Sequence, residues 1–211
     1  MQNSIDNSFL LSNNLAMTND LQSSETKLKM AEALKKLVNY KAFSKITVGD
    51  IVNECGLNRN SFYYHFENMY DLLYWTYDQE IQNITTSFQN ANADYTQSFE
   101  FILSYIDRNI NLCQAAYESL GENDLQNMIE RDLKLFLTFS VSIISEETKV
   151  EISEDFKNFL IFNFCPMVRF QIVWYIKYND KLDKAKFLDY IKTAFYDSLR
   201  ATILSGGKKE L

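Results

Sequence analysis

The stretch TVGDIVNECGLNRNSFYYHF, residues 47–66, contains the pattern of two short helices separated by a tight turn. Thr47 can cap the first helix, and Asp50, three residues later, completes a capping-box-like pair. Gly56 stands where the chain needs a left-handed turn after a helix end, and Asn58 can cap the second helix. The pattern therefore predicts a helix-turn-helix.

The second helix of this stretch has two chemically different sides. Phe62 and Phe66 fall on one face because they are four residues apart. The other sides carry groups that form hydrogen bonds or stack: Arg59, Asn60, Ser61, Tyr63 and Tyr64. A tight turn followed by such a helix is the geometry that places a recognition helix in the major groove of double-stranded DNA.

The charge of the chain is segregated along the sequence. The formal net charge is −7, which by itself argues against a nucleic-acid partner. Residues 25–66, however, contain seven Lys or Arg against four Asp or Glu, a net charge of +3, so the remaining residues carry −10. A small basic region on an acidic body would steer one end of the molecule toward phosphate.

Composition favours a globular protein without catalytic or metal chemistry. Hydrophobic residues make up 46% of the 211 residues and charged residues 23%. The most apolar stretch, residues 156–178, is interrupted by polar and charged residues, so we interpret it as a buried helix and expect no membrane partner. The amino terminus lacks a secretory signal pattern, which predicts a cytoplasmic protein. Because His65 is the only histidine and the three cysteines are widely spaced, we expect no metal, no cofactor and no enzymatic activity.

The rest of the chain reads as further helices. An Asn- and Ser-rich arm is expected over residues 1–24, a DNA-binding domain over 25–70, and a larger helical domain over 71–211. No alternating strand pattern is present, so the predicted fold is all-α, a three-helix head joined to a larger α-helical bundle. The expected helices of the bundle cover residues 68–88, 96–120, 124–146, 154–178 and 183–204.

Residues 43–73 also resemble a known family. The segment FSKITVGDIVNECGLNRNSFYYHFENMYDLL follows the pattern of the tetracycline-repressor (TetR/AcrR) family of bacterial regulators: an aromatic before the first helix, an I-T-V start, a turn, an F-Y-Y-H-F motif and a new helix ending in D-L-L. The combination of N-E-C-G-L-N-R with F-Y-Y-H-F and Y-D-L-L-Y-W is similar to the branch that includes the activator of dihydroxyacetone-kinase operons.

The resemblance implies a symmetric dimer that reads DNA bases with the recognition helix. Arg59 pairing with guanine and Asn60 with adenine would be the bidentate base contacts. The full expected sets are base reading by Arg59, Asn60, Ser61 and Tyr63, and phosphate contact by Lys45, Thr47, Tyr64 and His65. The chain departs from the family at Asn60, where glycine is common, and at Met69, where lysine is common.

The carboxy-terminal bundle leaves two questions open. Polar groups within its aromatic helices could line a pocket for a small-molecule effector, formed by Asn163, Arg169, Phe170, Trp174, Phe136 and Tyr105, or they could equally face solvent or the dimer partner. By family analogy, the last helices would form the homodimer interface through Phe187, Ile191, Phe195, Leu199 and Ile203. The alternative is a co-regulator whose bundle binds a partner effector-sensing protein instead of a ligand.

Overall fold

The computed structural model describes residues 22–90, 98–120 and 122–210, and no β-strand occurs within these ranges. The chain folds as two compact units, Met1–Thr76 and Tyr77–Leu211. The boundary lies inside helix α4 (Met69–Asn90), whereas the sequence placed it at residue 70, near the start of the same helix. The expected arm, residues 1–24, lies outside the described residues except for its last three, which belong to the first helix.

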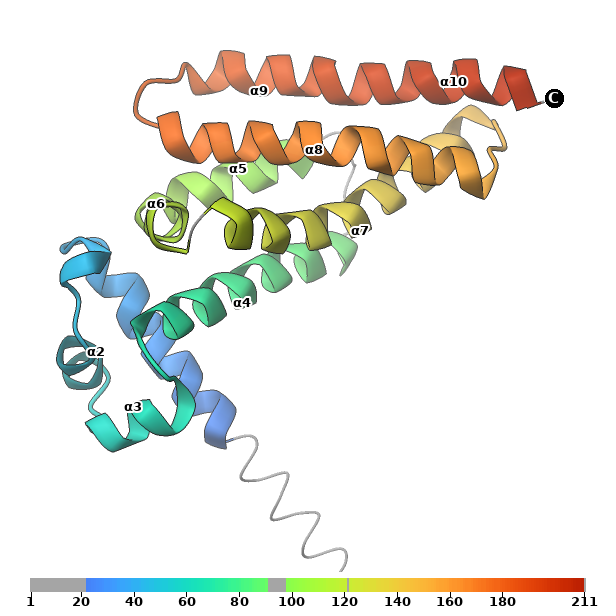
Figure 1. The fold of residues 1–211 in the computed structure, drawn as a ribbon. Helices are drawn as coiled ribbons and strands as arrows, with labels where there is room; N and C mark the ends of the chain where they lie inside the picture. The colour runs from blue at the N-terminus through green and yellow to red at the C-terminus, as the bar shows by residue number, and fades with distance from the viewer. Residues whose placement is uncertain (1–21, 91–97, 121, 211) are drawn as a thin grey trace, which may run out of the picture. The chain divides into compact units, whose positions relative to one another are not determined.

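The amino-terminal unit is the predicted three-helix head. Its first helix covers residues 22–37 and is followed by the 3₁₀ turn η1 (Phe43–Lys45), α2 (Val48–Glu54) and α3 (Arg59–His65) (Figure 1). The first turns of α4 complete the unit, because the Asn68 side chain caps them by accepting the N–H groups of Tyr70 and Asp71. The core of the unit consists of buried side chains from every element: Met30, Leu34, Phe43, Ile46, Ile51, Phe62, Phe66, Leu72 and Leu73.

The carboxy-terminal unit is a helical bundle. Besides the second part of α4 it contains α5 (Ser98–Arg108), α6 (Ile110–Ser119), α7 (Glu122–Thr148) and α8 (Glu154–Tyr178). The last helical stretch consists of α9 (Lys184–Lys192), the π-helical turn η3 (Thr193–Asp197) and α10 (Ser198–Glu210), and it runs back along α8 (Figure 1). The most extensive packing joins α7 to α8.

The single helix predicted over residues 96–120 is wrong, because α5 and α6 are separated at Asn109. The Asn109 backbone has φ −121° and ψ 27°, which is outside the helical region. Its side-chain amide donates to the Tyr105 carbonyl at 3.0 Å and so satisfies a carbonyl at the end of α5. Asparagine competes for backbone hydrogen bonds in this way, and the apolar periodicity on either side conceals the break.

Helix α8 differs from the buried helix that the sequence suggested. It is long and apolar enough to cross a membrane by length and composition alone, but it packs within the unit against α6, α7 and α10. One face is buried through residues such as Leu160, Val168 and Ile176. Only 33% of its most apolar window is buried, so the opposite face presents large apolar side chains to solvent.

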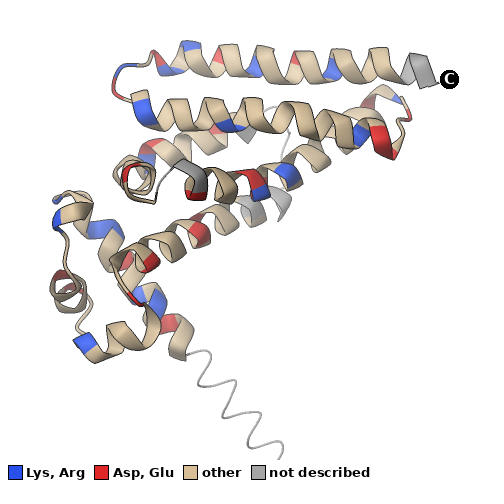
Figure 2. Ribbon diagram, in the orientation of Figure 1, with Lys and Arg blue, Asp and Glu red and all other residues tan. Residues whose placement is uncertain are grey.

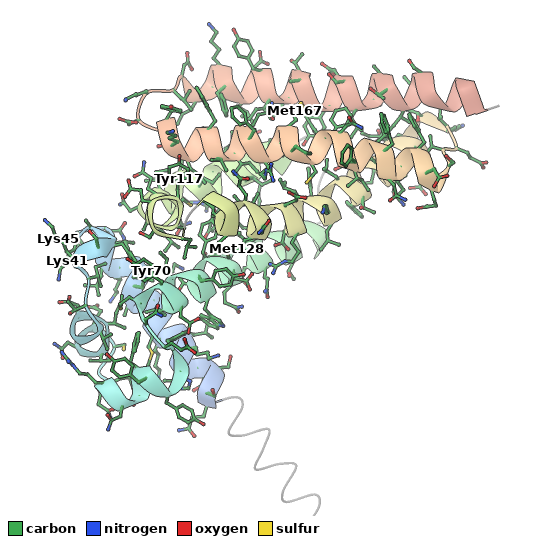
Figure 3. The ribbon with its side chains drawn as sticks, in the orientation of Figure 1. Lys41, Lys45, Tyr70, Tyr117, Met128 and Met167 are labelled. Carbon is green, nitrogen blue, oxygen red and sulfur yellow. The ribbon has the colours of Figure 1, made fainter. Side chains whose placement is uncertain are left out.

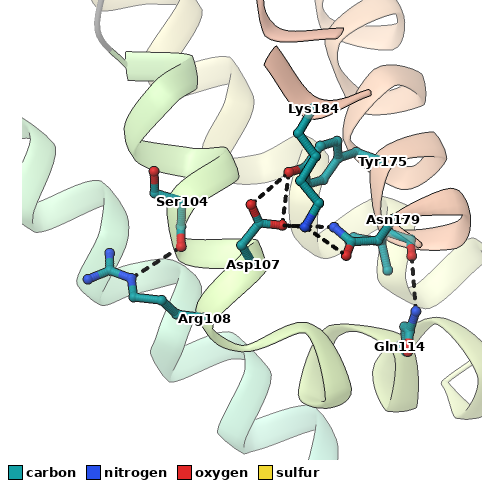
Figure 4. Close-up of polar contacts among 8 residues, drawn as sticks. Ser104, Asp107, Arg108, Gln114, Tyr175, Asn179 and Lys184 are labelled. Atoms are coloured by element: carbon teal, nitrogen blue, oxygen red, sulfur yellow. Dashed lines mark hydrogen bonds and ion pairs between the residues drawn. The ribbon is translucent and has the colours of Figure 1, made fainter. Parts of the chain in front are cut away.

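A polar cluster around Asp107 joins α5, α8 and α9 (Figure 4). The Asp107 carboxylate accepts hydrogen bonds from the Tyr175 hydroxyl at 2.8 Å, from Asn179 Nδ2 at 2.8 Å and from Lys184 Nζ at 2.7 Å. Burial raises the pKa of Asp107, but these donors outweigh it and hold the pKa below its ordinary value. Tyr175 and Asn179 are buried, so the cluster gives the end of α8 a fixed position in the bundle.

Candidate nucleic-acid interface and effector cavity

Local contacts define both ends of α2, and the sequence predicted the capping box at its start and the left-handed turn after its end. Thr47 Oγ1 accepts the Asp50 N–H at 3.2 Å, and Asp50 Oδ2 accepts the Thr47 N–H at 2.8 Å, which completes a capping box. Gly56 has φ +67°, and the Leu57 N–H then donates to the Val52 carbonyl at 2.8 Å. The turn thus ends α2 sharply and fixes where α3 begins.

Three of the four residues expected to read bases are exposed to solvent on helix α3. Phe62 is completely buried, which places Arg59, Asn60 and Tyr63 on exposed positions, with Tyr63 58% exposed. Ser61 is half-buried, and its backbone N–H and hydroxyl both donate to Asn58 Oδ1, at 2.9 and 3.3 Å. The Ser61 hydroxyl therefore belongs to the helix cap and is less available to a base edge.

Arg59 lies against the start of α2. A Cβ atom on Gly49 would lie 3.3 Å from Arg59 Nη2 and 3.5 Å from Thr47 Oγ1. The missing side chain at Gly49 therefore leaves room for the guanidinium beside Thr47. A residue expected to read bases and a residue expected to contact phosphate thus occupy one surface, formed by the amino-terminal ends of α2 and α3.

The expected phosphate contacts are distributed unevenly. Lys45 and Tyr64 are exposed, Tyr64 by 81%, and Figure 3 shows Lys45 close to Lys41 at the connection before α2. His65 is half-buried, with Nδ1 3.4 Å from the Ser23 hydroxyl oxygen. Burial, followed by the positive charge of Lys27, lowers the pKa of His65. A neutral His65 imidazole packed on the first helix would bind a phosphate more weakly than the side chain of Lys45.

Ion pairs neutralise part of the positive charge of this unit, whose Lys and Arg residues are blue in Figure 2. Three lysines pair with carboxylates: Lys35 with Glu32, Lys36 with Glu54, and Lys41 with Asp50. Hydrogen bonds from Lys41 and from the Thr47 backbone and side chain lower the pKa of Asp50 to about 2. Among the described residues that appear in no ion pair of this unit, Lys45 and Arg59 lie beside the turn, where phosphates would approach.

The carboxy-terminal unit contains an apolar cavity of about 90 Å³, formed between α4, α5, α7 and one residue of α8. Eight Ile or Leu side chains contribute to its wall. Its remaining lining residues are five aromatic and two acidic: Tyr77, Phe101, Tyr105, Phe136, Phe139, Glu80 and Asp132. Phe101, Leu135 and Phe139 are each at least 40% exposed, so they form its mouth.

Two of the six residues predicted to form an effector pocket line this cavity, namely Tyr105 and Phe136. The other four lie elsewhere. Arg169 pairs with Glu130 of α7 at 2.7 Å, and Asn163 is exposed and donates to the Phe159 carbonyl of its own helix. Phe170 and Trp174 are exposed on α8, by 63% and 41%. The sequence analysis missed the side of the cavity wall that α4 forms. Its signal in the sequence is the stripe Tyr77, Ile81 and Ile84, whose members recur at helical spacing.

Polar contacts hold α4 to both neighbouring helices at this cavity. The Tyr105 hydroxyl of α5 donates to Glu80 of α4, and burial, with that carboxylate, raises the pKa of Tyr105. Arg131 of α7 bridges Asp78 of α4 at 2.8 Å and Asp132 at 2.7 Å. The apolar stripe of α4 is therefore flanked by one hydrogen bond and one ion-pair bridge.

The residues predicted for the dimer interface make their contacts within one protomer, on the side of the last helical stretch that packs into its own unit. Ile191 is 2% exposed, and Phe195, Leu199 and Ile203 are completely buried within one protomer. Phe195 contacts the rings of Phe99, Phe136 and Phe164, and thus fills the core of its own bundle. The fifth residue, Phe187, stacks on Tyr175.

Sequence reasoning missed the exposed aromatic face of α8. We call this set the α8 aromatic face: Phe159, Phe162, Phe170 and Trp174, which are 56%, 76%, 63% and 41% exposed. Their spacing of three, eight and four residues keeps them on one side of the helix. Soluble monomers rarely leave so much contiguous apolar surface in water, and such patches mark interaction sites.

Comparisons with known proteins agree on the amino-terminal unit. Residues 32–74 match the family model described as bacterial regulatory proteins, tetR family. Over 83 residues the chain is 30% identical to the HTH-type dhaKLM operon transcriptional activator DhaS of Lactococcus lactis subsp. lactis (strain IL1403). This alignment covers 38% of the chain and 42% of that protein, so the chain spans less than half the length of this curated relative.

Solved structures extend the similarity to both units at the level of the fold. A dihydroxyacetone kinase operon activator DhaS matches with a TM-score of 0.63 and 21% identity, covering 86% of this chain and 97% of that one. A TetR transcriptional regulator from Streptococcus agalactiae 2603V matches with a TM-score of 0.51 and 24% identity, covering 85% and 98%. Through its helix-turn-helix unit, which matches the family model over residues 32–74, and through the fold of its helical second unit, the chain resembles the tetR family of bacterial transcription regulators and, among them, the DhaS branch.

Proposed function

We propose that the protein is a homodimeric regulator that binds a pseudo-palindromic DNA operator in the cytoplasm. In this proposal residues 25–70 form the DNA-binding domain and residues 71–211 the effector-binding and dimerisation domain. The observation that carries it is the surface of α3, where Arg59, Asn60 and Tyr63 face solvent around the buried Phe62. Helices of this kind enter the major groove with their first turn, and the exposed groups are then within reach of base edges.

The position of Arg59 determines which residues of this surface we assign to phosphate contact and which to base reading. Because its guanidinium lies beside Thr47, it can bind a phosphate at the start of α2, or extend to a guanine edge. Asn60 and Tyr63 are exposed on α3, and they are the residues that we assign to base reading. Lys45 and Tyr64 supply further phosphate contacts, which set the register of the head on DNA without reading sequence.

The α8 aromatic face supports the homodimer. A two-fold axis that crosses α8 brings the same face of a second copy against it, so that each protomer covers the exposed rings of the other. The core of such an interface is enriched in aromatic side chains, as this face is. A dimer also presents two α3 helices, which matches the two half-sites of a pseudo-palindrome.

Regulation by a small-molecule effector is supported by the cavity beneath α4. The cavity wall includes Tyr77, Ile81 and Ile84, and α4 itself begins in the DNA-binding unit. An effector that binds one arrangement of α4 better than another shifts the population of that arrangement. The coupling element that we propose is therefore α4.

A partner protein is the second candidate regulator. The cavity volume of about 90 Å³ is well below the roughly 300 Å³ at which ligand pockets of drug size begin. Such a volume suits only a compact ligand, so a bulky effector would have to be sensed by another protein that binds the carboxy-terminal unit. Co-purification of a stoichiometric partner favours this candidate, whereas saturable binding of a metabolite by the pure protein favours the first.

Fluorescence anisotropy with DNA fragments from the gene's own neighbourhood tests the proposal. We expect tight, salt-sensitive binding to one fragment, and binding at least tenfold weaker to random DNA of equal length. Tyr63→Ala should abolish the preference for that fragment. Tyr40→Ala is the matched control, because Tyr40 is also an exposed tyrosine, by 88%, and lies outside α3. Folded protein that binds every fragment no better than random DNA refutes the proposal.

Arg59→Ala separates the two roles of the arginine. If the guanidinium binds a phosphate, the variant weakens binding to all sequences alike and lowers the salt slope by about 1 for each half-site. If it reads a guanine, the loss is about 1–3 kcal/mol for each half-site of the operator, and discrimination disappears at one base position in each half-site. A variant whose binding equals that of the wild-type protein removes Arg59 from the interface.

A further inference from the structure

The cavity of the carboxy-terminal unit is apolar but carries acidic groups at its wall. Glu80 and Asp132 are lining residues, and no Lys, Arg or His occurs among the lining residues that the structure describes. Just behind the wall, Arg131 binds both Asp132 and Asp78. The wall and the groups directly behind it thus include three carboxylates and one guanidinium.

An excess of negative charge beside an apolar wall attracts cations. The interaction between charges is stronger here than in water, because the Ile, Leu and aromatic side chains exclude solvent. An isolated anion or a neutral polyol gains nothing from such a wall. The anion is repelled by Glu80 and Asp132, and the polyol would leave most of its hydroxyl groups against carbon.

The aromatic lining selects among cations. Five rings surround the cavity, and the faces of aromatic rings attract positive charge that has already lost its water. A strongly hydrated metal ion does not fit this description, since the wall offers few oxygen ligands. An ammonium that carries alkyl groups does fit, because its charge is spread over an apolar surface.

We propose that this cavity binds a compact alkylated ammonium ion, with the positive charge close to Glu80 and Asp132 and the alkyl groups against the aromatic rings. The inference rests on the proposed function in one respect, namely that the cavity is the effector site. Its volume of about 90 Å³ limits the enclosed part to a single compact head such as trimethylammonium. Longer substituents on the nitrogen would extend out of the cavity through its mouth at Phe101, Leu135 and Phe139.

Isothermal titration calorimetry with choline tests the charge preference directly on the full-length protein. The matched probe is the uncharged analogue of choline in which a carbon atom replaces the ammonium nitrogen. The two molecules have nearly the same shape, so any difference in affinity reports charge. We expect saturable choline binding at one site per chain, and affinity for the uncharged analogue at least about tenfold weaker.

Two variants test whether choline binds in this cavity, beside Glu80. Glu80→Gln keeps an acceptor for the Tyr105 hydroxyl but removes one negative charge, and it should weaken choline binding about tenfold without changing the affinity for the uncharged analogue. Glu118→Gln is the control, because Glu118 is an exposed acid of α6 that does not line the cavity. Equal affinity for the two probes, or no saturable choline binding by folded wild-type protein, overturns the proposal.

The outcome is independent of DNA binding. Choline binding that depends on Glu80 in a protein without operator affinity leaves this inference intact and refutes the proposed function. Operator binding together with equal affinity for choline and its uncharged analogue supports the proposed function and refutes this inference. If choline binds, addition of choline to the operator complex in the anisotropy assay then shows whether occupancy of the cavity changes the affinity for DNA.

Discussion

In the proposed homodimer the α8 aromatic face forms the contact between protomers, and Phe162→Ala tests this assignment most sharply. Phe162 is 76% exposed in the single chain, so its side chain has little to lose in the monomer and much to gain on association. A phenylalanine offers roughly 200 Å² of surface, of which this exposure leaves about 150 Å² available, and alanine retains about a third of that area. The substitution thus removes about 100 Å² of apolar contact per protomer.

The resulting loss is large because a two-fold dimer contains the residue twice. At about 25 cal/mol per Å², each protomer loses about 2.5 kcal/mol and the dimer about 5 kcal/mol. Since about 1.4 kcal/mol corresponds to tenfold in an equilibrium constant, the dimer dissociation constant should rise by three to four orders of magnitude. These figures are upper estimates, because they assume complete burial in the dimer.

Sedimentation velocity over a wide concentration range measures this constant. Tyr40→Ala is the control, since it removes an 88% exposed aromatic ring from the amino-terminal unit. The thermal unfolding midpoint of Phe162→Ala, measured at a concentration where the wild-type protein is monomeric, should not change. A dissociation constant within threefold of the wild-type value would refute the assignment of this face, and a wild-type protein that stays monomeric at every concentration would refute the homodimer.

Three further substitutions test how the fold holds its sites. Thr47→Ala removes the cap of α2 and should cost about 1 kcal/mol of unfolding free energy, measured by urea denaturation, with a serine variant as the control. Gly56→Ala should cost about 1 kcal/mol in the same assay, because φ is +67° and no neighbouring atom would contact the added methyl group; an increase in stability would contradict the left-handed turn. Asp107→Ala leaves buried hydrogen-bond donors without their acceptor and should cost about 1–3 kcal/mol at neutral pH. Because the folded-state pKa of Asp107 lies below its ordinary value of 3.8, the wild-type advantage is fully present above that pH and is lost as the pH falls below it. An advantage that is the same at pH 3 and pH 7 would contradict this role.

Local signals in the sequence predicted the head well. The capping box at Thr47, the turn at Gly56 and the cap at Asn58 are contacts between residues at most a few positions apart, so their geometry is readable from spacing. The pairing of Phe62 and Phe66 identified the buried side of α3, and thereby the exposed side, by simple helical periodicity. Ser61 was misjudged because its hydroxyl has a competing local acceptor in Asn58.

The bundle was predicted less well, because most of its errors concern contacts between helices that are distant in the sequence. The stripe containing Phe195 and Leu199 has the same periodicity whether it is buried in its own protomer or in a dimer. The aromatic side chains of α8 gave no clear stripe, since both faces of this helix are apolar. The pocket prediction failed at Arg169 because Glu130, 39 residues away in the sequence, provides its partner.

The sequence by itself determined the all-α class, the helix-turn-helix with the exposed side of its second helix, and the resemblance to the tetR family. Each of these depends on caps, turns and periodicities that act within a few residues, where the covalent chain limits the choices. The tertiary structure alone decided that Phe195 belongs to the core, that Phe162 remains exposed, and that Glu80 and Asp132 share one cavity wall. The physical reason is that burial depends on which helices meet, and hydrophobic attraction carries no directional information about its partner.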